Sequence, residues 1–505
     1  MVYLRSADPA TANHYLDATE HYLALYSKLL GAYPYSKFAL VENFWETGYG
    51  MPSFTLLGPT VIRLPFIIHT SYPHEILHNW WGNGVYPDYA SGNWSEGLTS
   101  YLADHLLQEQ RGMGADYRRT TLQRYADSVK KQKDFPLTAF RSRHGQASQA
   151  IGYGKTMMFF HMLRQQLGDD VFIKGLRYFY KKNLFRIAGF NALRSAFEFV
   201  SKKDLSMEFK QWTTRIGAPS IKLNNVTVKK TAAGYNLTAT IAQAQAGAAF
   251  SLKIPILVQI NGSDEYSRHI FSMHKKTETL NLRFDNQPLR IKVDPQFDLF
   301  RQLDPSEIPS SFAQLFGTDQ ALIILPSKGT NELKAAYEKL ANNWAQRSPA
   351  LKIMWDTEIK NLPTDQSIWL LGESNILLKT VEDSIKAELF NKKTAQLILN
   401  KKGFSKTNHS FAVTTRNSAN KQHTIGWVSA HSSAAIPHLF RKLPHYKKYS
   451  YLVFEGDAAK NIYKGKWPLD ESALNVITHN DHIRPDLEFT SHPALVRSTK
   501  KDNKH

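Results

Sequence analysis

The spacing of apolar residues changes along the chain, and its first part reads as mainly helical. Up to about residue 217, apolar positions recur three and four residues apart, which is the spacing of one face of an amphipathic helix. Gly31 and Gly168 each follow such a stretch and are typical helix ends. Residues 36–57, rich in aromatics and glycine, predict a strand followed by an irregular loop. The predicted helices span residues 11–30, 67–81, 94–110, 152–167 and 171–182.

The pattern after Pro219 is that of strands. Short segments with alternating apolar and polar residues, separated by turns such as Asn261-Gly262, predict a small β-sandwich. From Ala321 onward, apolar runs typical of buried strands alternate with a helical stretch, an order that predicts an α/β domain. These runs lie at residues 321–325, 367–371 and 451–454, and the helical stretch lies at 331–344.

The sequence thus predicts a multidomain α+β protein. Its parts are a mainly helical domain at residues 1–217, a β-sandwich at 218–303 and an α/β domain at 313–495, with a linker at 303–311. The α/β domain carries neither a GxGxxG motif nor a Walker loop, so we assign it no cofactor and no role.

Composition limits the chemistry and the location. The chain has 505 residues, no cysteine and a formal net charge of +19. Any metal must therefore be held by His, Asp or Glu. No apolar run approaches the ~18 residues that span a bilayer, and the opening residues lack the apolar core of a secretory signal. We expect a cytoplasmic chain, or a periplasmic or secreted one if an N-terminal signal has been lost.

Positive charge is concentrated between Lys386 and Lys448, where twelve Lys or Arg accompany one acid, Glu388. Such a stretch can attract nucleic acid, anionic lipid or an envelope polymer. Nothing near it resembles a nucleic-acid-binding module, so a solvated basic face is the simpler interpretation and no nucleic-acid partner is expected.

The segment from His74 to His78 reads His-Glu-Ile-Leu-His and carries the candidate chemistry. On a helix, residues four apart lie on one face, so both imidazoles can reach a single ion. Glu75 sits at the edge of that face, where it can reach a metal-bound water without being a ligand. Zinc with an open fourth position lowers the pKa of bound water to about 7, and a neighbouring carboxylate can take the proton. Five residues alone leave a structural role for these side chains open.

The surrounding residues strengthen this interpretation. The motif continues as Asn79-Trp-Trp-Gly-Asn83, and Trp94-Ser-Glu-Gly97 opens the next predicted helix. This resembles the gluzincin aminopeptidases, the family of alanyl aminopeptidase and leukotriene hydrolase. The resemblance implies a thermolysin-like, mainly helical catalytic domain that binds one zinc ion through His74, His78 and Glu96, with Glu75 as the general base.

One connection departs from the family pattern. Seventeen residues separate His78 from Glu96, one fewer than the family usually has, and the difference falls in the connection 84–93. Length changes there are tolerated because connections run over the surface. The alternative acid, Asp88, lies in mid-loop without matching context.

Upstream, Ala39-Leu-Val-Glu-Asn43 resembles the family's Gly-x-Met-Glu-Asn strand. The resemblance implies that Glu42, with Asn43 beside it, binds the α-amine of the substrate, since a carboxylate holds an ammonium by charge-assisted hydrogen bonds. The glycine and methionine of that pattern are Ala39 and Val41 here.

Ile151-Gly-Tyr-Gly-Lys155 precedes an apolar helix and is similar to the family's Tyr-x-Lys-Gly motif. The resemblance makes Tyr153 the donor of a hydrogen bond to the oxyanion of the tetrahedral intermediate. It covers about residues 14–310. The large β-domain that family members carry before the catalytic domain is not found in the chain as given.

The expected function is that of a zinc aminopeptidase acting on peptides with a free N-terminus. Two alternatives stay open. One is an endopeptidase that shares the catalytic helices but not the amine anchor. The other is a weakly active binding module that uses the basic C-terminal domain.

Overall fold

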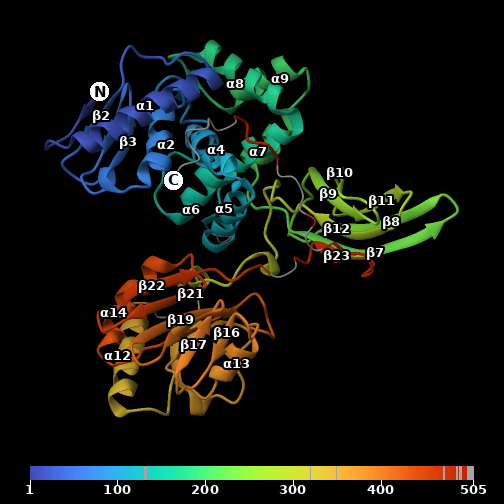
Figure 1. Cartoon of the computed structure of the whole chain (residues 1–505). Helices are drawn as coiled ribbons and strands as arrows, with labels where there is room; N and C mark the ends of the chain where they lie inside the picture. Colours follow the sequence, from blue (N-terminus) through green and yellow to red (C-terminus); the bar gives the residue numbers. More distant parts are fainter. Residues whose placement is uncertain are drawn as a thin grey trace. The chain divides into compact units, whose positions relative to one another are not determined.

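The computed structural model describes residues 1–129, 133–318, 320–347, 350–469, 472–484, 487 and 492–496. The chain forms two compact units. The first comprises Met1–Gln302 and Ala473–His505, and the second comprises Leu303–Ser472 (Figure 1). Among the described residues, no helix is both long and apolar enough to cross a bilayer.

The first part of unit 1 is mainly helical, as its apolar periodicity predicts (Figure 1). Helix α1, for example, buries one face, with Tyr15, Tyr22 and Tyr26. The helices are α1 (Pro9–Leu30), α2 (Ser71–Leu77), α3 (Ser95–Ser100), α4 (Leu106–Gln110), α5 (Gly114–Ser128), α6 (Gln146–Gln149), α7 (Thr156–Leu167), α8 (Asp169–Asn183), α9 (Phe190–Ser201) and α10 (Ser206–Thr214).

Two of the predicted long helices contain a π-helical segment. Tyr101–His105 joins α3 to α4, and Ala150–Lys155 joins α6 to α7. A π turn holds one residue more than an α turn and shifts the side chains that follow it around the helix axis. The predicted helix 67–81 is shorter than expected, because a 3₁₀ turn at Ile67–His69 precedes α2 and the chain leaves the helix at His78.

A four-stranded sheet lies beside α2, where a strand and an irregular loop are predicted. Its order is β1 (Val2–Tyr3), β2 (Ala39–Glu42), β4 (Phe54–Leu57) and β3 (Gly48–Met51), so that β3 is an edge strand. The turn Pro52-Ser53 connects β3 to β4, with Met51 opposite Phe54 and Ser53 at φ 69°. A proline at the first central position and a positive φ at the second are typical of a type II turn. The prediction missed this hairpin because alternation is weak in so short a strand.

Two further sheets follow in unit 1. One has the order β11 (Thr277–Phe284), β8 (Gly234–Gln243), β7 (Ile221–Thr231). The other has the order β10 (Ser267–Met273), β9 (Leu252–Ile260), β12 (Pro288–Val293), β23 (Asn475–Ile477). Alternate residues are buried, as with Leu237, Ala239 and Ile241 of β8, which is the pattern of sheets with one face in a core.

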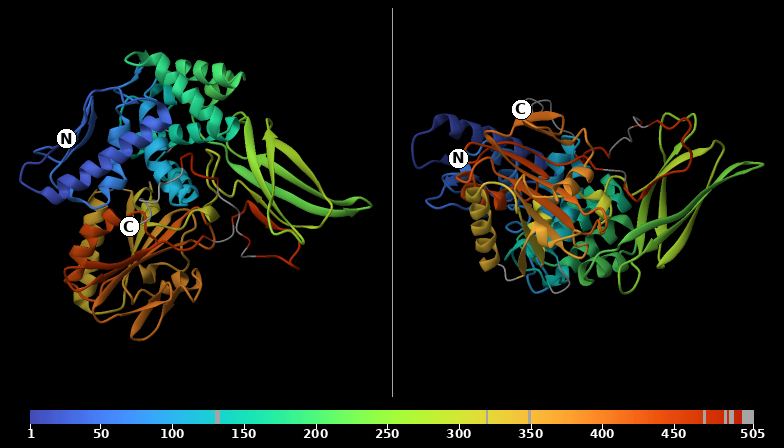
Figure 2. Two further views of the ribbon diagram at one scale, coloured as in Figure 1. Left: turned by 45° about the horizontal axis from the view of Figure 1, so that its top comes forward. Right: turned by 90° about the horizontal axis from the view of Figure 1, so that it is seen from below.

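Unit 2 is built on a seven-stranded mixed sheet. Ile323 and Ile324, neighbours in β13, belong to separate apolar clusters, so both faces of the sheet are covered (Figure 2). The sheet order is β14 (Leu351–Trp355), β13 (Ala321–Leu325), β15 (Ser367–Leu371), β20 (Thr424–Ser429), β19 (His409–Arg416), β21 (Tyr451–Glu455), β22 (Lys460–Gly465). Smaller elements are α11 (Phe312–Phe316), α12 (Asn331–Arg347), α13 (Leu378–Asp383), α14 (Ala435–Lys442), β16 (Phe390–Lys392), β17 (Gln396–Leu399) and β18 (Lys402–Ser405).

The α/β unit ends earlier than the predicted domain boundary at residue 495. Unit 2 stops at Ser472, and the chain then returns to unit 1, where β23 pairs antiparallel with β12 through Val476 and Ile291. A strand of three residues gives no periodic signal, so its partner is not visible in the sequence.

Candidate metal centre

The two histidines of the motif lie together at the end of α2. The His74 and His78 rings are 4.9 Å apart between centroids. Glu96 enters from the first turn of α3, with its Oε2 atom 3.5 Å from His74 Nε2 and 3.4 Å from His78 Nε2. One ligand atom from each of the three residues lies within 4.8 Å of the others. The spacing of four residues thus brings both imidazoles to one acid, as predicted.

Each imidazole is fixed by a partner at its other nitrogen. His74 Nδ1 lies 2.7 Å from Asp104 Oδ2, and His78 Nδ1 lies 2.8 Å from the Trp81 carbonyl oxygen. Because a carboxylate and a carbonyl can only accept, both Nδ1 atoms donate. The Nε2 atoms therefore face the space shared with Glu96, and in the neutral rings that bind a metal their lone pairs point there, which is how metal-binding histidines are held.

The charges at this cluster favour a cation. Burial lowers the pKa of His74, but the Asp104 carboxylate, together with those of Glu96 and Glu75, holds that pKa well above its usual range. Burial raises the pKa of Glu96, yet the adjacent His78 and His74 rings bring it below its usual range. Glu96 is therefore a carboxylate. Two imidazole nitrogens and one carboxylate oxygen form a common zinc donor set with room for a fourth ligand, so the residues present fit the metal.

Glu75 lies on the side of α2 that faces the edge strand β3. A Cβ atom added to Gly50 would lie 2.8 Å from the Glu75 carbonyl oxygen and 3.0 Å from its Oε2 atom, and one added to Gly48 would lie 3.8 Å from Oε1. The glycines therefore let β3 approach the helix closely. As a result, the Glu75 carboxylate lies against the edge strand, outside the three-ligand cluster.

Tyr153 belongs to the same site. Its ring is nearly parallel to that of His74, with 6.3 Å between centroids. Burial raises the pKa of the Tyr153 phenol, and the nearby Glu96 and Glu75 carboxylates raise it further. The phenol therefore keeps its proton at neutral pH and can donate it in a hydrogen bond.

The structure does not support Glu42 as the amine anchor. Glu42 lies in β2, which β4 separates from the edge strand. Its carboxylate is 2.5 Å from the Arg63 guanidinium and accepts the Arg5 backbone N–H at 2.9 Å, and only 3% of the side chain is exposed. The hydrogen bond from Arg63 holds the Glu42 pKa below its usual range. A carboxylate already neutralised in this way is not free for a substrate ammonium, so this prediction is corrected.

Asn43 is likewise engaged in the fold. Its backbone N–H donates to Leu57 O at 2.8 Å, and its side-chain oxygen accepts from Phe44 N at 2.9 Å. The side-chain nitrogen is buried and has no hydrogen-bond partner among the described residues.

The sequence prediction missed Asp104 and the Trp81 carbonyl. Asp104 follows Glu96 by eight residues, which on a regular α-helix turns its side chain about 80° away from that of Glu96. The π-helical segment Tyr101–His105 takes up one residue and brings Asp104 to the His74 side. The available signal was an acid, Asp104, about two turns after the ligand acid Glu96. The π turn that directs the Asp104 side chain to His74 is not visible in the sequence.

Comparison with known proteins agrees with this geometry. Residues 68–212 match the peptidase family M1 domain. The chain is 23% identical over 397 residues to the alanine/arginine aminopeptidase of Saccharomyces cerevisiae, a match that covers 73% of this chain and 44% of the relative. Over 158 residues it is 27% identical to aminopeptidase 2, mitochondrial, of the same yeast, covering 30% of this chain and 17% of the relative.

Aminopeptidase N of Lactococcus lactis is 24% identical over 157 residues, which are 29% of this chain and 18% of the relative. The chain thus spans less than half the length of the curated relatives it matches. The matched residues contain both histidines, Glu96 and Tyr153. Residues 68–212 of the chain, which hold the candidate metal centre, are therefore similar to the peptidase family M1 domain.

Proposed function

We propose that the chain is a zinc aminopeptidase that removes N-terminal residues from peptides. The observation that carries this proposal is the cluster of His74, His78 and Glu96, with ligand atoms within 4.8 Å of one another and both rings oriented by fixed acceptors. The aminopeptidase names of the relatives support the choice of reaction. We further propose one zinc ion per chain and a thermolysin-like arrangement of residues 1–217.

Each residue around the cluster has a part in the proposed hydrolysis. Zinc, when bound, polarises the scissile carbonyl and lowers the pKa of water at its open position. Glu75 accepts the proton of the attacking water and passes it to the leaving amine. Tyr153 donates a hydrogen bond to the oxygen that gains negative charge, a contribution typically worth about 10²–10³ in rate.

A second candidate is an endopeptidase on the same scaffold, and one observation favours it. The acid expected to bind the substrate amine, Glu42, is held by Arg63, and the edge strand beside Glu75 reads Gly48-Tyr-Gly-Met51, without an ionisable acid. An aminopeptidase of this kind therefore needs another group to recognise the α-amine.

Matched reporter peptides separate the two candidates. A pair with the same sequence, one with a free and one with an acetylated N-terminus, should differ strongly, with only the free peptide losing its first residue. A chelator should abolish the cleavage and added zinc restore it. Cleavage of the acetylated peptide at an internal bond would replace the aminopeptidase by the endopeptidase, and no metal-dependent cleavage of either peptide would remove both.

A further inference from the structure

A buried ion pair connects two helical segments of the catalytic part of the chain. The first, residues 95–110, contains Glu96, and the second, residues 150–167, contains Tyr153. Glu109, in the first segment, accepts two hydrogen bonds from Arg164 Nη1 at 3.0 and 2.9 Å. Arg164 lies in the last turn of α7, which closes the second segment. The Glu109 and Arg164 side chains are 4% and 1% exposed. A buried pair of this kind is stable only if its remaining polar atoms are also paired.

Asp169 and Tyr101 also accept hydrogen bonds from Arg164, and the C-terminal part of the chain supplies further partners to both members of the pair. The Leu495 backbone N–H donates to Glu109 Oε2 at 3.0 Å, and the Pro493 carbonyl accepts from Arg164 Nη2 at 2.9 Å. Gln110 adds a bond from its side chain to the Val496 carbonyl at 2.9 Å. Residues from the far end of the sequence thus complete the hydrogen bonding of a buried pair in the catalytic domain.

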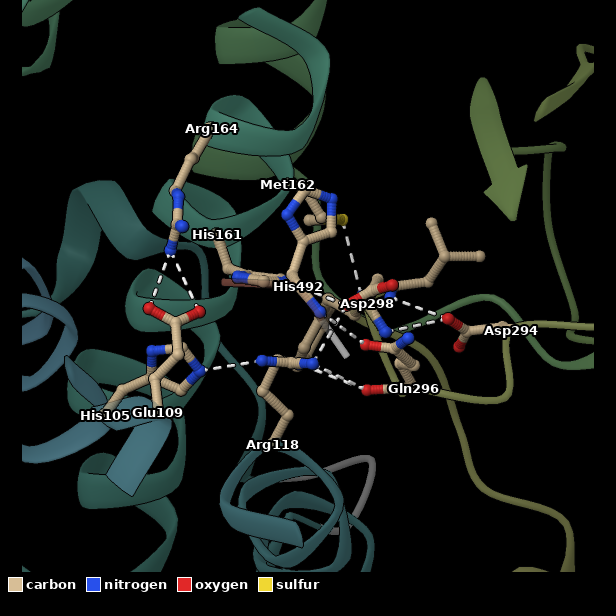
Figure 3. A network of polar contacts seen from close by, with 12 residues as sticks. His105, Glu109, Arg118, His161, Met162, Arg164, Asp294, Gln296, Asp298 and His492 are labelled. Carbon is tan, nitrogen blue, oxygen red and sulfur yellow. Dashed lines mark hydrogen bonds and ion pairs between the residues drawn. The ribbon is translucent and has the colours of Figure 1, made fainter. Parts of the chain in front are cut away.

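The same segment extends the polar network shown in Figure 3. The His492 N–H donates to Gln296 Oε1 at 3.4 Å, and Gln296 carries the backbone oxygen to which Arg118 donates at 3.2 and 3.0 Å. His161 and Arg118 both contact Asp298. The network therefore joins α5, α7 and the loop after β12 to residues 492–496.

The two helical segments also touch near the site itself. A Cβ added to Gly97, beside Glu96, would lie 2.2 Å from Thr156 Cβ, so the segments are in close contact there. They are thus joined near the metal cluster by this contact, in between by the hydrogen bond of Tyr101 with His161 at 3.1 Å, and by the ion pair about 12–18 Å further along, at ~1.5 Å per helical residue. Loosening the ion pair would weaken the far end of this contact and let Glu96 shift relative to Tyr153.

We propose that residues 492–496 form a C-terminal clasp that positions Glu96 and Tyr153 by completing the Glu109–Arg164 pair. The clasp is a positioning element and makes no contact with the reacting groups. Its effect on the metal and on turnover rests on the proposed function, whereas its effect on the two helical segments does not.

Leu495→Pro with Leu495→Ala as its control isolates the key bond, because both variants lose the leucine side chain and only proline loses the N–H. Hydrogen exchange is measured in the metal-free protein. Removing one of the two hydrogen bonds that the buried Glu109 Oε2 atom accepts should speed amide exchange in residues 95–110 and 150–167 by about tenfold relative to the alanine variant. Exchange in α1 should be the same in both and serves as the internal reference.

A second pair of variants tests whether the effect passes through the ion pair. In a Glu109→Gln background, the difference between proline and alanine at position 495 should shrink markedly, since the acceptor charge is gone. In the zinc-loaded protein, Leu495→Pro should release zinc to a chelator several-fold faster than Leu495→Ala. If Leu495→Pro does not fold, Gln110→Ala replaces it and should show the same localised exchange to a smaller extent.

Equal exchange of the proline and alanine variants in both segments would overturn the clasp, as would faster exchange that is as large in α1. An unchanged difference in the Glu109→Gln background would show that the segment acts by another route. Failure of the wild-type protein to bind zinc would remove the proposed function, while the exchange measurements would still decide on the clasp.

Discussion

The carboxylate of Asp104 lies 2.7 Å from His74 Nδ1, on the opposite side of the ring from Glu96. This contact fixes the tautomer of His74 and turns its Nε2 atom toward the candidate ligands. Asp104, which lies outside the His74–His78 motif, thus sets the orientation of the His74 ring.

Asp104→Asn should weaken zinc affinity by about 10–100-fold, because the amide is a poorer partner for the imidazole N–H. Competition with a chromogenic chelator measures this. Asp17→Asn, an exposed acid on α1, is the matched control and should leave the affinity unchanged. Equal affinities in the two variants would remove Asp104 from the metal centre.

Glu42→Gln tests the corrected role of Glu42. If this acid serves the fold, Glu42→Gln and Arg63→Met should each lower the free energy of unfolding by about 1–2 kcal/mol, since each breaks the same partly exposed pair. The KM for the peptide with a free N-terminus should stay constant. A selective rise in KM for the free peptide, in Glu42→Gln alone, would restore Glu42 as the amine anchor.

Gly50→Ala tests the close approach of β3 to α2. The added methyl would lie 2.8 Å from both the Glu75 carbonyl oxygen and His78 Cβ, so strand or helix must shift, at a cost of about 1–3 kcal/mol. Zinc affinity and turnover should both fall. Gly145→Ala, where a Cβ meets nothing within 4 Å, is the control for adding a methyl. Normal zinc affinity and turnover in Gly50→Ala would mean that the strand has room to move without consequence.

The buried histidines of Figure 3 predict a pH dependence of stability. Burial and the Arg118 charge lower the pKa of His161 to about 3, and the same causes hold that of His105 well below its usual range. Below about pH 6.5 the unfolded chain protonates both while the folded chain does not. Stability is therefore fully present above that pH and is lost as the pH falls, by about 1.4 kcal/mol per pH unit for each histidine.

Denaturant unfolding between about pH 5 and 6.5 measures this slope, in a window that lies above most carboxylate titration. His161→Gln should reduce the slope by one proton, whereas His144→Gln, at an exposed position, should leave it unchanged. The same slope in His161→Gln and the wild type would show that His161 is protonated in the folded protein.

Local patterns in the sequence predicted what depends on local structure. The apolar runs 321–325 and 367–371 coincide with β13 and β15, because a strand buried on both faces needs an unbroken apolar run. The spacing of His74 and His78 predicted their common target, since four residues make one helical turn.

Features that depend on distant pairing were not predictable in this way. Glu42 has the sequence context of an amine anchor, yet Arg63 and the order of strands decide which acid faces the site. The π turn that brings Asp104 to His74 and the return of residues 475–477 to β12 leave no periodic trace. Both arise from packing between segments far apart in the chain.

His74, His78 and Glu96 are proposed to hold zinc, and Glu75 to transfer the proton. One paired measurement separates these two roles. Zinc content and turnover are determined together for the wild type, Glu75→Gln and Glu96→Gln. Glu75→Gln should keep about one zinc per chain and lose at least about 10²-fold in kcat, whereas Glu96→Gln should lose the metal itself. Full turnover in Glu75→Gln, or undiminished zinc binding in Glu96→Gln, would contradict these roles.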